Sequence, residues 1–150
     1  MISLVRATSD HKDFIELVKF LDAYLAIIDG DEHSFYAQFN KIDSLKNVVI
    51  AFENEEAIGC GAFKPFEEDK VEIKRMFVRE EARGKKIASQ ILTELELWAE
   101  ELGLKHFVLE TGIRQSAAVA LYSKMGYQII PNYGQYIGIA NSVCFEKKIV

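Results

Sequence analysis

The hydrophobic and polar positions of this chain change their period several times, and each change marks an expected element. A short apolar stretch at 2–5 predicts a first strand, after which Ser9 or Asp10 is placed to cap a helix. Over residues 12–28 apolar positions recur at three- and four-residue steps, which predicts an amphipathic helix. A shorter helical pattern follows at 35–42.

Three stretches rich in β-branched and apolar residues then follow one another, separated by acidic turns. They cover 48–52, 57–66 and 71–79, and their short connections predict an antiparallel meander. The period returns to that of a helix over 85–102, and Gly103 supplies the stop expected after a helix.

The last third of the chain alternates in the same way. Residues 107–109 predict a central strand, 117–125 a helix closed by Gly126, and 128–132 and 142–149 two final strands. A strand, helix, strand unit within a mostly antiparallel set predicts an α/β protein with a mixed sheet and helices on both faces.

Composition limits the possible functions. A chain of 150 residues with 49% apolar residues fits one domain over 1–150. The net charge of -5 argues against a nucleic-acid partner, which usually requires a basic surface. The start lacks a signal-peptide core and no apolar run approaches the roughly 20 residues of a membrane span. We therefore expect a soluble cytoplasmic protein without a membrane partner, in which Cys60 and Cys144 are reduced core residues.

The sharpest local feature is a basic turn between the expected strand at 71–79 and the next helix. Its six residues are Arg83, Gly84, Lys85, Lys86, Ile87 and Ala88. The first amides of a helix have no partners within the helix and favour an anion. Gly84 lets the backbone approach an oxyanion closely, and three cations flank it. This turn indicates a pyrophosphate site, with an ordinary solvated basic turn as the alternative.

A second motif lies downstream, where residues 118–127 read Ala-Val-Ala-Leu-Tyr-Ser-Lys-Met-Gly-Tyr. Together with the basic turn and the segments 73–78 and 109–112, it resembles the GNAT superfamily of N-acetyltransferases. That family has a phosphate loop of the form Arg/Gln-x-x-Gly-x-Gly/Ala and a helix of the form Ala-x-x-Leu-Tyr-x-Lys-x-Gly-Phe. The resemblance covers roughly 47–130. Lys86 departs from it, because the family usually has its second glycine there.

The resemblance implies the GNAT fold, with a mostly antiparallel sheet of about six or seven strands flanked by about four helices. It also implies that acetyl-CoA is bound where the fourth and fifth strands splay apart, with its pantetheine arm along the main chain of Met76, Phe77 and Val78. Further cofactor contacts are implied at Gln115, Ser116 and Lys124, although Ser116 could instead serve as a helix cap.

Tyr122 is the residue that the resemblance selects first for catalysis. The family uses a tyrosine here as the acid that protonates the departing thiolate of coenzyme A. A phenol with a pKa near 10 is reasonably matched to a thiol with a pKa near 8.5. The alternative is a half-buried aromatic side chain in a helix.

Glu72 is the candidate general base for the acceptor amine, as in some family members. Regular strand alternation places Glu72, Lys74 and Met76 on one face and Arg75 on the other. The alternative is that Glu72 forms a surface salt link with Lys74. Glu110 is a second candidate for the same task.

We therefore expect an N-acetyltransferase that moves the acetyl group of acetyl-CoA directly to a primary amine of a small molecule, such as an amino acid or polyamine, in a ternary complex. No Ser-His-Asp or Cys-His arrangement is evident, and direct attack needs no enzyme nucleophile. His11, His33 and His106 lack metal-ligand spacing, so no metal site is expected. The alternatives are a protein lysine or N-terminal acetyltransferase and a non-catalytic acyl-CoA sensor.

The acceptor side is the least defined part of the sequence. The acidic run 29–32 and the aromatic residues Phe35, Tyr36 and Phe39 are expected to form one wall of an acceptor site for a cationic amine. The alternative for the acidic run is a solvated helix terminus. The segment 133–136 is expected to form the opposite lip or a flexible turn. Pairing through the last strands is common in the family, so a homodimer is the candidate assembly.

Overall fold

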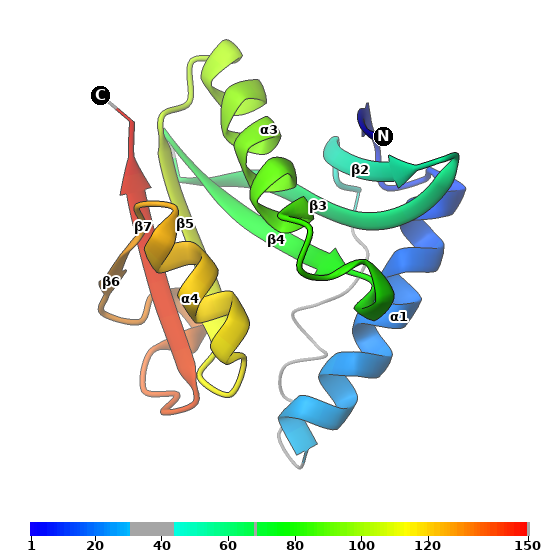
Figure 1. The fold of residues 1–150 in the computed structure, drawn as a ribbon. Coiled ribbons are helices and arrows are strands. Elements are labelled where there is room, and N and C mark those ends of the chain that lie inside the picture. The colour runs from blue at the N-terminus through cyan, green and yellow to red at the C-terminus, as the bar shows by residue number, and fades with distance from the viewer. Residues whose placement is uncertain (31–43, 68, 150) are drawn as a thin grey trace.

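The computed structural model describes residues 1–30, 44–67 and 69–149, and Figure 1 shows its ribbon. The helical pattern at 35–42 and the expected acceptor-wall residues within 31–39 lie outside the described residues. The elements discussed below all belong to the described part of the chain.

The described strands form one seven-stranded sheet in the order β1-β2-β3-β4-β5-β7-β6. Neighbours are antiparallel except β4 and β5, which are parallel. The strands are β1 (Ile2–Ala7), β2 (Asn47–Glu53), β3 (Glu56–Glu67), β4 (Lys70–Val78), β5 (His106–Gly112), β6 (Gln128–Ile130) and β7 (Ser142–Lys148). The prediction of a mixed, mostly antiparallel sheet is confirmed.

Three α-helices lie within the described residues: α1 (Lys12–Asp29), α3 (Ile87–Glu101) and α4 (Ser116–Lys124). Two single-turn 3-10 helices, η2 (Glu80–Ala82) and η3 (Gly134–Tyr136), lie in the connections. Side chains of α3 and α4 share one hydrophobic core on one face of the sheet, whereas α1 packs on the other face. Figure 1 shows α3 crossing in front of the sheet. The expected helices on both faces are confirmed.

The two cores explain why the helices hold their places. Ile91, Leu92 and Leu95 of α3 are fully buried against the sheet, and Phe14 and Leu17 of α1 are fully buried on the opposite face. Burial of each such side chain stabilises the fold by about 1.5–3 kcal/mol. The apolar stripes read from the sequence are therefore the surfaces that fix both helices on the sheet.

The cap of α1 differs from the expectation that Ser9 or Asp10 provides it. The N-cap is His11, whose Nδ1 accepts a hydrogen bond from the Asp13 amide at 3.1 Å. Ser9 is used elsewhere, because its Oγ accepts from the Leu45 amide at 3.0 Å. The carboxylate of Asp10 accepts from a nearby threonine hydroxyl. Both expected caps are thus occupied by contacts that hold the turn before the helix.

The parallel pair β4 and β5 is short. Its pairing covers only residues 70–72 of β4 and 106–108 of β5. Beyond these residues the two strands diverge, with the end of β4 running to the right in Figure 1 and β5 running down on the left. Among the described residues, no strand pairs with that side of β4 beyond Glu72. The expected splay of the fourth and fifth strands is confirmed.

A β-bulge interrupts β4 just where the splay begins. Cys60 pairs with Phe77 and Ala62 with Lys74, so one residue of β3 lies opposite two residues of β4, Arg75 and Met76. Arg75 has a φ of 59°, in the left-handed region that a side chain disfavours by roughly 1–2 kcal/mol. The extra residue locally turns the strand.

The bulge shows that the expected alternation along β4 is wrong after Lys74. Glu72 and Lys74 share the α1 face, but Arg75 faces α1 as well and forms an ion pair with Asp22. Met76 turns to the other face and packs in the core below α3. Strict alternation failed because one inserted residue exchanges the faces of every residue that follows it.

The two thiols are expected to be inert in the folded protein. Burial raises the pKa of Cys60 to about 12 and that of Cys144 to about 11, so both stay protonated at neutral and mildly alkaline pH. At pH 8 the native protein should not react with an aromatic disulfide reagent, whereas both thiols should react quickly in urea. Rapid native-state labelling would show that one of these strands opens readily.

Candidate active site

A cavity of about 380 Å³ opens where β4 and β5 diverge. Its walls come from all of 72–78 on β4, from parts of 82–89 and 110–112, and from one face of α4. The side chains of Leu21, Tyr24 and Leu25 close it on the α1 side. The short pairing of β4 and β5 therefore places strand backbone, a helix N-terminus and several ionisable groups around one space.

The basic turn forms the end of the cavity next to α3. Gly84 has a φ of 85° and Lys86 a φ of 62°, and Lys86 is the N-cap of α3. No side chain caps the helix and its first turn carries no acidic residue. The amides of the first turn, with the positive end of the helix dipole, are thus available to an anion. The left-handed backbone of Lys86 also explains why glycine is usual there in the GNAT family.

Arg83 is fixed beside this anion seat. Its Nε donates a hydrogen bond to the main-chain oxygen of Val78 at 3.1 Å. Its guanidinium lies over the ring of Tyr24, 5.1 Å from the centroid. The cation is therefore held at the cavity wall between the end of β4 and α1.

The structure brings most of the expected site residues together. The cavity is lined by Glu72, Met76, Phe77, Val78, Arg83, Gly84, Lys86, Ile87, Ala88, Gln115 and Tyr122. Three expected residues do not line it: Lys85, Ser116 and Lys124. The roles assigned to all of them stay predictions.

Lys85 and Ser116, which do not line the cavity, have other positions. The Nζ of Lys85 forms a surface ion pair with Oε1 of Glu53 at 3.2 Å. Gln115 occupies the N-cap position of α4 without a side-chain capping bond, and Ser116 is the first helical residue. The alternative reading of Ser116 as the cap is therefore wrong.

Tyr122 lies at the α4 wall of the cavity and is only 6% exposed. Its ring packs against those of Tyr127 and Phe145, each with a centroid separation of 5.8 Å. Burial raises the pKa of the Tyr122 phenol, and the negative charge of Glu110 raises it further. The phenol therefore keeps its proton throughout the neutral pH range.

Glu72, in the β4 wall of the cavity, is buried at 4% exposure. Its Oε2 accepts a hydrogen bond from the hydroxyl of Tyr133 at 2.6 Å. Its Oε1 lies 3.8 Å from the Nζ of Lys74 and 4.0 Å from that of Lys64. The proposed link to Lys74 is thus present, but it lies in a cavity wall and not on an exposed surface. Glu110 lines the same cavity.

Sequence reasoning missed the contact of Tyr133 with Glu72 and the place of Arg75 in the cavity wall. Burial raises the pKa of Tyr133, and the nearby carboxylate of Glu72 raises it further, so its hydroxyl stays a donor. Edge-to-face packing on Phe66, with centroids 4.8 Å apart, holds its ring. The segment 133–136 was expected to form a lip, and Tyr136 indeed lines the cavity.

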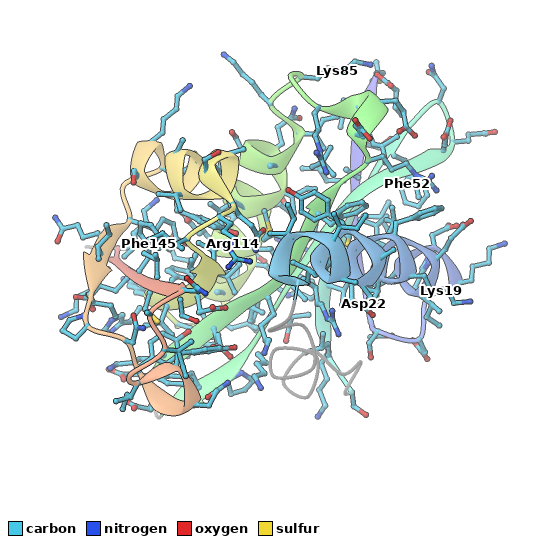
Figure 2. All side chains as sticks on the ribbon, turned by 90° about the horizontal axis from the view of Figure 1, so that it is seen from below. Lys19, Asp22, Phe52, Lys85, Arg114 and Phe145 are labelled. Atoms are coloured by element: carbon cyan, nitrogen blue, oxygen red, sulfur yellow. The ribbon has the colours of Figure 1, made fainter. Side chains whose placement is uncertain are left out.

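The end of α1 is tied to the segment that precedes α4. Nη1 of Arg114 donates a hydrogen bond to the main-chain oxygen of Ile28 at 3.2 Å. Figure 2 shows Arg114 lying between these two helices. This contact links the α1 wall of the cavity to the α4 wall at the end far from the sheet pairing.

The described residues contain no group of three or more His, Cys, Asp or Glu side chains that could hold a metal ion. His11 caps α1, and Nε2 of His106 lies 2.9 Å from Oε1 of Glu146. His33 lies outside the described residues. Separately, no helix in the described part of the chain is long and apolar enough to cross a membrane.

Comparisons with known proteins agree with this geometry. The model of the acetyltransferase (GNAT) family matches residues 15–127. The chain is 30% identical to an IAA acetyltransferase of Azospirillum brasilense, over 99% of this chain and 98% of that protein.

Two solved structures have the same fold. A Klebsiella pneumoniae protein assigned to the acyl-CoA N-acyltransferases is 29% identical with a TM-score of 0.84, over 100% of this chain and 99% of that one. The PaiA N-acetyltransferase of Thermoplasma acidophilum, solved with coenzyme A, is 21% identical with a TM-score of 0.72, over 99% of each chain. Since the family model spans most of the sequence and a relative matches it from end to end, this chain belongs to the acetyltransferase (GNAT) family and is an acyltransferase.

Proposed function

We propose that residues 1–150 act as one domain that transfers the acetyl group of acetyl-CoA directly to a primary amine of a small molecule. The observation that carries this proposal is that one cavity joins the uncapped N-terminus of α3 to Glu72 and Tyr122. An anion seat, a buried carboxylate and a protonated phenol are the three groups that this reaction needs in one place.

The donor side of the cavity fits coenzyme A. Amides of the first turn of α3, with Arg83 and Lys86 beside them, suit a diphosphate. A Cβ at Gly84 would meet no atom within 4 Å, so the space above that turn is open. Main-chain groups of 76–78 face the splay, where an extended amide chain could pair with them as a strand would.

When bound, acetyl-CoA supplies an acetyl thioester whose carbonyl carbon is open to attack by an amine. A primary amine is mostly protonated at neutral pH, with a pKa near 10, and must lose a proton before or during attack. We assign that proton to Glu72, directly or through a water molecule. Tyr133 holds the carboxylate in one orientation by its hydrogen bond. Glu110 is the second candidate, because it lines the same cavity.

We assign to Tyr122 the stabilisation of the departing thiolate. Because its phenol stays protonated, it can donate a hydrogen bond and then a proton to sulfur. Burial and the charge of Glu110, which raise its pKa, also disfavour a lasting phenolate. The phenol should therefore regain a proton quickly, and the proton released by the amine is the available source.

A small acceptor is supported by the modest volume of the cavity, about 380 Å³. Leu21 and Leu25 of α1 and Tyr136 of η3 line it, and Arg114 joins the ends of its two walls. A protein acetyltransferase would have to admit a peptide between these elements. A non-catalytic acyl-CoA sensor would have no use for the pair Glu72 and Tyr122.

Thiol release from acetyl-CoA with a panel of amines tests the activity directly. We expect coenzyme A to form only when a suitable amine is present, together with the acetylated amine as detected by mass spectrometry. Binding of coenzyme A in calorimetry without release by any small amine or any lysine peptide would favour the sensor. Release with peptides alone would favour a protein acetyltransferase.

Replacing Tyr122 with Phe removes the acid and should lower kcat by about 10²-fold, with little change in the affinity for coenzyme A. Tyr127→Phe is the matched control, because the Tyr127 hydroxyl bonds to Glu96 at 2.8 Å and does not line the cavity. That variant should lose thermal stability and keep its kcat. An unchanged kcat in Tyr122→Phe would remove Tyr122 from the mechanism.

Replacing Glu72 with Gln should lower kcat/KM by about 10²-fold at pH 7. The loss should shrink at higher pH, because the neutral fraction of the amine rises about tenfold per pH unit below its pKa. Glu67→Gln, on an exposed carboxylate paired with Lys70, should match the parent protein. A loss in Glu72→Gln that stays constant with pH would point to Glu110 as the base.

A further inference from the structure

Arg75 is a buried cation in the cavity wall that the proposed reaction does not use. It occupies the β4 bulge with a left-handed φ of 59°, although nothing in its local sequence requires that conformation. Strained backbone of this kind persists where the surrounding structure enforces it, and it clusters at functional sites. Its effect here is to direct the guanidinium to the α1 face, where it pairs with Asp22, and Arg75 is one of the residues that line the cavity.

The guanidinium has an unused donor. The side chain is 3% exposed, and its Nη1 donates to Oδ1 of Asp22 at 2.8 Å. Its Nη2 is buried and has no hydrogen-bond partner among the residues that the structure describes. Figure 2 shows Asp22 on α1, where its side chain is 49% exposed and its charge is partly screened by solvent. Since buried donors are almost always satisfied, an acceptor that enters the cavity would complete this group.

The neighbouring charges indicate which chemical group would accept a hydrogen bond from Nη2. Lys74 also lines the cavity, and its positive charge lies 3.8 Å from the carboxylate of Glu72. Arg75 therefore adds a second buried cation on the same face of β4. The guanidinium fork matches a carboxylate in shape and charge, and Nη2 provides an open position for one of its oxygens.

The amine of the acceptor requires negative charge, whereas its carboxylate requires positive charge. Glu72 and Glu110 both line the cavity and suit an ammonium group. The apolar side chains of Leu21 and Leu25 offer a surface for an uncharged part of the acceptor. The acceptor half of the cavity thus presents carboxylates, a buried guanidinium and an apolar wall together.

From this arrangement we propose that the acceptor is an amino acid: its amine is acetylated, and its carboxylate is bound by Arg75. This inference rests on the proposed function and narrows its substrate class. It differs from the sequence-based expectation of an acidic site for a simple cationic amine, because a polyamine would place a positive charge against Arg75 and Lys74.

Matched pairs of amines test the proposal in the unmodified protein. Phenylalanine with phenethylamine, tyrosine with tyramine, and lysine with cadaverine differ by the carboxylate alone. We expect kcat/KM to favour the amino acid in at least one pair by about 10- to 100-fold, with most of the difference in KM. Equal or better turnover of the decarboxylated amine in every pair would overturn the proposal.

Variants of the ion pair between Arg75 and Asp22 distinguish carboxylate recognition by Arg75 from a purely structural role. Arg75→Gln should abolish the preference within the pair, and Arg75→Lys should keep part of it. If Arg75 only ties α1 to β4, Asp22→Asn and Arg75→Gln should lower Tm alike, and neither should change the preference. That result would also overturn the proposal. The pairwise test in the unmodified protein stands even if Arg75→Gln does not fold.

Calorimetry with coenzyme A present distinguishes this proposal from the proposed function. If amino acids bind more tightly than their decarboxylated partners but no thiol is released, the carboxylate site stands and the transferase activity fails. If amines release thiol regardless of the carboxylate, the activity stands and the carboxylate site fails.

Discussion

The candidate site depends on the short main-chain pairing between β4 and β5. Two parallel strands with continuous hydrogen bonds would close the sheet, but these two pair only over 70–72 and 106–108. An unpaired strand edge inside a protein is unfavourable, because main-chain donors and acceptors need partners. The fold tolerates this edge since the cavity lies along it, and a ligand with amide groups can satisfy it. The same divergence sets α4 apart from α1 and determines the width of the cavity.

The bulge on β4 is the second constraint, and it acts on the side chains. One added residue opposite Gly61 exchanges the faces of the residues after Lys74, so that Met76 packs in the core below α3 while Arg75 faces α1. A Cβ at Gly61 would meet the sulfur of Met76 and the buried side chains of Ile91 and Leu95, so a larger residue there would require all three side chains to shift. Gly61 on β3 and Arg75 on β4 therefore act together. The glycine leaves room for Met76 in the core below α3, and the bulge turns the Arg75 side chain to the α1 face.

The sequence predicted the order and type of the described strands and α-helices, and most of their bounds lie within a few residues of those observed. It did not predict the two short 3-10 helices η2 and η3. Apolar periodicity carries that information because burial on one face is what holds each helix and strand. It could not locate the bulge, since inserting one residue leaves the neighbouring pattern almost unchanged. Nor could it find the bond between Tyr133 and Glu72, which joins residues 61 positions apart. Such contacts are set by the packing of the whole chain and not by local preference.

Lys86, which stands where the family usually has a glycine, affects the rate at which an anionic donor reaches this turn. The protein as a whole carries a net charge of -5, which repels a donor as anionic as coenzyme A at long range. Arg83 and Lys86 place two positive charges in the cavity wall at this turn. If the donor binds at this turn as proposed, charge steers its encounter, and association slows as ionic strength rises. The main-chain hydrogen bonds that hold it afterwards depend far less on salt.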